Sequence, residues 1–117
     1  MFEHTWLTLV SYFFGGAFLS NAIPHFVSGS MGHPFQSPFA KPPGEGLSSS
    51  TVNVLWGFAN LAIAYLLIYR VGDFNLGSVA DAAALGLGFL LMGLMGAHLF
   101  GRFHGGNSPE DSNARSR

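Results

Sequence analysis

Charged residues are absent from three long stretches of this chain. Residues 4–40, 46–69 and 82–101 contain no Lys, Arg, Asp or Glu. Over the whole chain, 9% of residues are charged, against about 25% in a typical soluble domain. Because a soluble domain spreads charge over its surface, these stretches indicate that much of the chain faces something other than water.

An apolar run lies inside each uncharged stretch and approaches the length of a membrane span. A helix needs about 20 residues to cross a hydrocarbon core of about 30 Å. The chain is therefore predicted to be an all-α integral membrane protein. Its 117 residues suffice for one three-helix bundle over residues 1–106, followed by a polar tail at 107–117 that we expect to be disordered. The predicted transmembrane helices cover about residues 6–27, 52–70 and 79–102.

A connector rich in Pro, Gly and Phe, residues 28–51, joins the first two predicted spans. Five of the six prolines of the chain fall between Pro24 and Pro43, which predicts a segment without helix or strand. Phe35 and Phe39 favour burial, unlike the residues of a flexible linker. We therefore expect an ordered connector, either interfacial on the membrane surface or re-entrant into the mouth of the bundle.

The distribution of basic residues predicts the orientation. With three spans, the connector and the C-terminus share one side of the membrane. The N-terminus and the short turn between the second and third spans share the other. The connector side carries Lys41, Arg102, Arg115 and Arg117, whereas the other side carries Arg70 and the α-amine. The positive-inside rule then favours an outside N-terminus and a cytoplasmic C-terminus, in a bacterial inner (cytoplasmic) membrane.

Polar side chains recur on one face of each of the first two spans. Asn21 and His25 are four residues apart, and Asn53 and Asn60 share a stripe with Gly57. An amide facing lipid would leave hydrogen bonds unmet, so Asn60 is expected to point at another helix. The four polar side chains either form hydrogen bonds between helices or line a path for a transported ligand.

The third predicted span contains a ladder of small residues. Gly93, Ala97 and Gly101 recur every four residues, a spacing that lets helix backbones approach closely. We expect this ladder to pack against another helix, either within the chain or in a second copy. Three helices bury little surface alone, so a homo-oligomer or a larger membrane complex is predicted, with the lipid bilayer as the other partner.

Four histidines are predicted at the same end of the bundle, namely His25, His33, His98 and His104. Imidazole ligates metal ions and haem iron and titrates near neutrality, so such a cluster suits a metal site, a haem site or a proton relay. Their spacings match no metal-binding motif, and a histidine at a helix end is most often a hydrogen-bonded interfacial residue. No cofactor is therefore predicted, with haem or a metal ion kept as the alternative.

Composition and motifs exclude several classes of function. The net charge is −1 without a basic patch, which disfavours nucleic acid, and there is no cysteine for thiolate chemistry. Neither a GxSxG elbow nor a nucleotide-binding glycine loop occurs, so we expect no enzyme. The favoured interpretation is a non-catalytic accessory or structural subunit. The alternatives are a small oligomeric transporter or channel and a redox membrane anchor associated with haem or quinone.

Overall fold

The computed structural model describes residues 5–104 and residue 106. It contains three helices and a two-stranded hairpin in the order α1 (Thr5–Ser30), β1 (Phe35–Gln36), β2 (Leu47–Ser48), α2 (Ser50–Tyr69) and α3 (Val79–His104). All three helices are long and apolar enough to cross a membrane. The three predicted helices are thus confirmed, whereas the tail at 107–117 lies outside the described residues.

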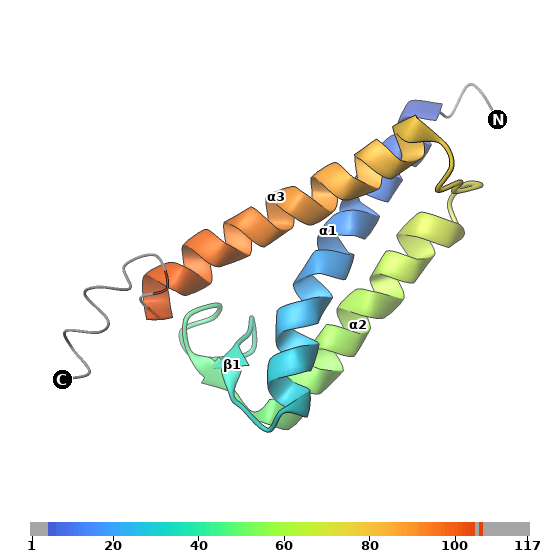
Figure 1. Cartoon of the computed structure of the whole chain (residues 1–117). Coiled ribbons are helices and arrows are strands. Elements are labelled where there is room, and N and C mark those ends of the chain that lie inside the picture. Colours follow the sequence, from blue (N-terminus) through green and yellow to red (C-terminus); the bar gives the residue numbers. More distant parts are fainter. Residues whose placement is uncertain (1–4, 105, 107–117) are drawn as a thin grey trace.

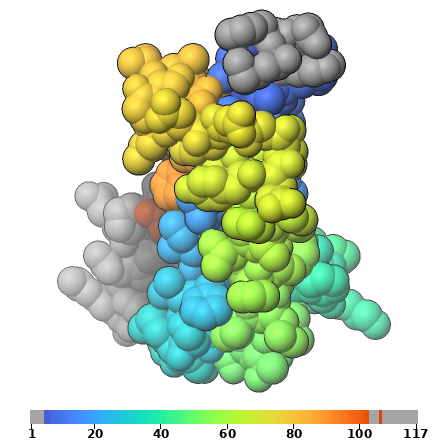
Figure 2. Space-filling model, turned by 90° about the vertical axis from the view of Figure 1, so that its right-hand side faces the viewer, coloured from blue at the N-terminus to red at the C-terminus, as the bar shows by residue number. Residues whose placement is uncertain are grey.

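Helix α1 is the centre of the bundle and packs against both α2 and α3. The three helices lie close together near the 70–78 turn, and α2 and α3 then diverge (Figure 1). The connector spans residues 31–49 rather than the predicted 28–51, because α1 ends at Ser30 and α2 begins at Ser50. It folds back at the open end, where its hairpin lies between α1 and the end of α3 (Figure 1). Seen from the α2 side, the connector protrudes beside the beginning of α2 (Figure 2).

Two glycines let α1 and α3 touch backbone to backbone. A Cβ atom added at Gly16 would overlap the carbonyl of Leu85, and one added at Gly88 would overlap the carbonyl of Phe13. Any side chain at either position would push the two helices apart. The tightest α1–α3 contact therefore lies more than one turn before the predicted ladder that starts at Gly93.

Helix α1 continues past Pro24 and ends at Ser30, three residues beyond the predicted end. Its last turn closes in a Schellman motif, in which the Gly32 amide donates to the Gly29 carbonyl and the His33 amide donates to the Ser28 carbonyl. Gly32 has a φ of 79°, which glycine adopts without strain. Local C-capping by Gly32, rather than the proline, therefore fixes where α1 ends.

The other two helices begin at serine caps. The Val52 backbone amide donates to the Ser49 hydroxyl, so Ser49 is the N-cap of α2. The Asp81 backbone N–H donates to the Ser78 hydroxyl, while the Asp81 carboxylate accepts from the Asn75 backbone N–H. Asp81 is thereby occupied in holding the 70–78 turn against the start of α3.

The connector contains a short antiparallel ladder, so the prediction of a segment without strands is wrong. Phe35 pairs with Ser48, and Gln36 pairs with Leu47. Neither two-residue strand contains a proline. Between them, the Gly44 amide donates to the Ser37 carbonyl, and the Gly46 amide donates to the Pro42 carbonyl. The prolines thus occupy the turns, and the strands occupy the proline-free ends of the segment.

Candidate functional site

The side chains of His25 and Asn53 join α1 to α2 at the open end of the bundle. His25 Nδ1 lies 2.8 Å from Asn53 Oδ1, and both residues are buried. The Asn53 amide nitrogen faces carbonyl oxygens, so its oxygen must be the acceptor in this contact. His25 Nδ1 therefore carries the hydrogen and donates it to Asn53.

Asn53 also ties the connector to the helices. Its Nδ2 atom lies within hydrogen-bond distance of three backbone carbonyls, those of Phe35 (3.0 Å), Ser48 (3.2 Å) and Ser49 (3.1 Å). Phe35 and Ser48 are the paired residues that begin and end the hairpin. One buried amide thus links α1, α2 and both ends of the connector, and we call the His25–Asn53 pair with these carbonyls the connector clamp.

A second amide pair lies further along the same interface. Asn21 Nδ2 donates to Asn60 Oδ1 at 3.0 Å, and Asn60 Nδ2 donates to the Trp56 carbonyl at 2.8 Å. Asn60 is completely buried, as expected for an amide that points at another helix. The four predicted polar residues are therefore brought together along the α1–α2 interface, where they are hydrogen-bonded to each other or to backbone.

Aromatic rings enclose His25 and link the connector to α3. The His25 ring makes edge-on contacts with Phe35, Trp56 and Phe100 at centroid distances of 5.3, 6.4 and 6.1 Å. Phe35 and Phe100 also contact each other at 5.0 Å, and Phe39 covers Trp56 at 5.3 Å. Phe35 thus packs on the bundle as a half-buried side chain, as expected for an ordered segment. Phe39 is 63% exposed, so the prediction that it favours burial is wrong.

A cavity of about 330 Å³ lies beneath the connector. Its wall includes Asn21, His25, Gln36, Ser37, Trp56 and Phe100. Gln36 is completely buried, and neither polar atom of its side chain has a hydrogen-bond partner within the described part of the chain; the same holds for Trp56 Nε1. The sequence analysis missed Gln36, because a lone glutamine between two prolines carries no recognisable signal.

The predicted histidine cluster is dispersed over three elements. His25 is buried in the connector clamp, whereas His33 on the connector and His98 on α3 are exposed. The His104 backbone ends α3, and its side chain lies outside what the structure describes. Among the described residues, no three His, Cys, Asp or Glu side chains come close enough to hold a metal ion.

Gly93 and Ala97 line a groove of about 400 Å³ between α1 and α3. A Cβ atom added at Gly93 would meet only the Ser20 hydroxyl at 3.5 Å, an ordinary contact distance. Gly101 is not part of this wall. Within the chain, the small residues of the ladder therefore keep space open between diverging helices, and packing of a second copy against them stays a prediction.

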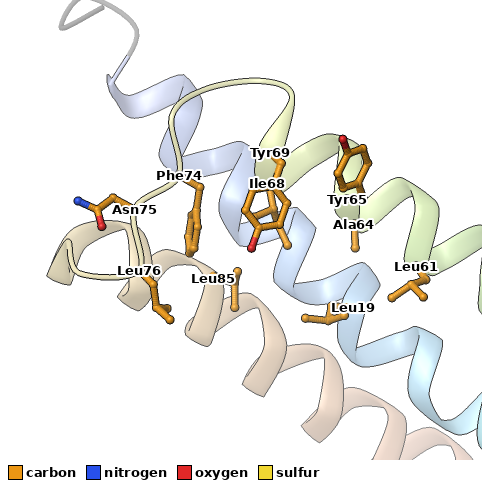
Figure 3. A pocket seen from close by; sticks show the side chains of 10 residues that line it. All are labelled: Leu19, Leu61, Ala64, Tyr65, Ile68, Tyr69, Phe74, Asn75, Leu76 and Leu85. Atoms are coloured by element: carbon orange, nitrogen blue, oxygen red, sulfur yellow. The ribbon is translucent and has the colours of Figure 1, made fainter.

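A larger apolar groove of about 620 Å³ lies near the 70–78 turn. Side chains from α2, such as Tyr65 and Ile68, face Phe74 of the turn and Leu85 of α3 across it, with Leu19 of α1 at its base (Figure 3). This wall offers apolar surface and few polar groups. It suits contact with hydrocarbon rather than a specific chemistry.

Comparison of the chain with protein-family models, with curated protein sequences and with solved structures finds no match.

Proposed function

We propose that this chain is an integral membrane protein that serves as a non-catalytic accessory or structural subunit of an oligomer or a larger membrane complex. The observation that carries the proposal is the connector clamp. One buried amide fixes an ordered, Phe-bearing connector at one end of the bundle. A fixed surface of this kind is suited to contact with a partner, because less ordering entropy is lost on binding than with a flexible segment.

The exposed surface supports the same role. The connector exposes large apolar side chains at Met31, Phe39 and Leu47. Helix α3 buries only 6% of the residues in its most apolar stretch, and Leu87, Leu91 and Leu94 are among its exposed residues. Lipid alone can cover α3, whereas exposed apolar groups on a rigid connector favour a protein neighbour.

A transporter or channel receives less support from the geometry. Asn21, Asn60, His25 and Asn53 would line its polar path, yet these side chains are hydrogen-bonded in pairs across the α1–α2 interface, and all but Asn21 are buried. A wetted path along them would require these hydrogen bonds to break. The alternative of a redox anchor requires a binding site for haem or quinone.

Photo-crosslinking in native membranes tests the accessory role. We would place benzoylphenylalanine at Phe39 on the connector and, as the matched control, at Leu76 in the exposed turn at the other end of the bundle. The proposal expects protein adducts, to a second copy or to another chain, from position 39 and fewer from position 76. Lipid adducts alone from position 39, together with a lone monomer in native mass spectrometry, would contradict it.

A further inference from the structure

His98 is a polar side chain on the exposed surface of an apolar helix. Helix α3 has 26 residues, and its uncharged stretch, 82–101, is bounded by Asp81 and Arg102. With these two charges at the boundaries of a hydrocarbon core of about 30 Å, His98 lies about 10 Å from the midplane, inside the core. Its side chain is exposed, and its imidazole has no hydrogen-bond partner within the described part of the chain.

The neighbours of α3 within the chain lie away from His98. Helix α1 contacts α3 through Leu85 and Gly88, and α2 and the connector lie on one side of α3 (Figure 1). Lipid covers the apolar side chains of the other side but offers an imidazole no hydrogen bond. Ionisable residues of transmembrane helices therefore almost always face other protein. His98 is thus available to a neighbouring molecule.

Three exposed leucines extend the surface that contains His98. Leu87, Leu91, Leu94 and His98 are spaced four, three and four residues apart, so they form a stripe along one face of α3. The leucines are 55%, 51% and 57% exposed, in that order. Two parallel helices pack along a seam with this alternating spacing, and a single polar residue in such a seam fixes the register. Because the stretch 82–101 is uncharged, two copies of this stripe bring no like charges together.

We propose that α3 pairs with α3 of a second copy along this stripe, about a two-fold axis, with the two His98 side chains hydrogen-bonded to each other. Copies inserted in the same direction have parallel helices, so a residue near the axis lies beside its own equivalent. A neutral imidazole has one N–H donor and one bare acceptor nitrogen, so one ring donates to the other. This self-complementarity favours a second copy over an unrelated helix. The inference rests on the proposed membrane location and is independent of what the connector contacts.

Disulfide formation in native membranes tests which face of α3 forms the pair. The chain has no cysteine, so Leu91→Cys introduces a single thiol on the stripe. Leu90→Cys is the matched control, because it has the same depth and similar exposure but is turned by about 100° around the helix. Under oxidation with copper phenanthroline, position 91 should give at least about fivefold more disulfide-linked dimer than position 90. Equal yields at the two positions, or no dimer at either, would overturn the proposal.

His98→Leu tests the contact between the two imidazoles, and His98→Asn is its control. Leucine has no hydrogen-bonding group, whereas the asparagine amide is again both donor and acceptor. Association is measured in phosphatidylcholine vesicles by energy transfer between copies labelled at Leu76→Cys in the exposed turn. The dissociation constant should rise about three- to twentyfold with leucine and less than about twofold with asparagine.

The substituted proteins also define the results that contradict the proposal. A dissociation constant that is unchanged by His98→Leu would exclude His98 from the interface, and equal weakening by leucine and asparagine would exclude the hydrogen-bonded pair. The melting temperature of the monomer should be the same in both variants, because the His98 side chain is exposed. Failure of this pairing leaves crosslinking from Phe39 unaffected, so this inference and the proposed function fail separately.

Discussion

Asn53 accepts a hydrogen bond from His25 through its side-chain oxygen, at 2.8 Å, and donates through its side-chain nitrogen to the two ends of the connector hairpin. Both polar atoms of one buried amide are therefore used. Leucine, of similar size, would leave the imidazole and these carbonyls without their partner. The connector is therefore held by an interaction between α1 and α2, which flank it on either side.

The Asn21–Asn60 pair should behave as an energetically coupled unit. In a double-mutant cycle with Asn21→Ala and Asn60→Ala, we expect a coupling of about 0.6–2 kcal/mol in unfolding from mild detergent. Asn60→Ala alone should be the more damaging, because it also loses the bond to the Trp56 carbonyl. Additive effects of the two substitutions would show that the 3.0 Å contact contributes no stability.

The α1–α3 crossing should tolerate no side chain. Gly88→Ala places a methyl group against the Phe13 carbonyl, and we expect a loss of about 1–3 kcal/mol in unfolding free energy. Gly86→Ala, two residues earlier in the same helix, meets open space and should be neutral or stabilising by up to about 1 kcal/mol. Equal effects of the two substitutions in thermal unfolding would argue against this crossing.

The absence of cysteine allows a direct test of topology by single-cysteine labelling. Met31→Cys on the connector and Leu76→Cys in the 70–78 turn replace exposed residues. The two positions lie at opposite ends of the bundle. In intact cells, a membrane-impermeant maleimide should label position 76 and spare position 31, because the connector side is expected to be cytoplasmic. Leu91→Cys, within α3, should stay unlabelled even after lysis.

Labelling of both exposed positions in intact cells would contradict the three-span arrangement. Labelling of position 31 alone would reverse the orientation and leave the three spans intact.

The helices were predictable because their determinants are local. Long uncharged apolar runs mark all three, and Ser49 follows the known preference for serine at helix N-termini. The end of α1 lies three residues beyond its predicted position, because the helix continues past Pro24 and is ended by the C-cap at Gly32, which Pro34 follows two residues later. A proline within an apolar helix removes one hydrogen bond but need not end the helix.

The candidate site was only partly predictable, because its contacts join distant segments. Helical spacing was enough to place Asn60 at an interface with another helix. Nothing in the sequence pairs Asn53 with the carbonyls of Phe35 and Ser48, or places Gln36 and Trp56 in the wall of the same cavity. Those contacts follow from the hairpin fold of the connector, whose strands are two residues long and so too short for a periodic pattern.

Hydrogen exchange of the connector amides in nanodiscs tests the central claim, that the connector clamp holds this segment in place. Gly44 and Gly46 donate to connector carbonyls, so both amides should exchange slowly in the parent protein. Asn53→Leu should speed their exchange at least about tenfold. Asn60→Leu is the control, because Asn60 is equally buried in the same helix and its hydrogen bonds do not reach the connector. Exchange at Gly44 and Gly46 that stays slow in the Asn53→Leu variant, or that is already fast in the parent protein, would contradict the account.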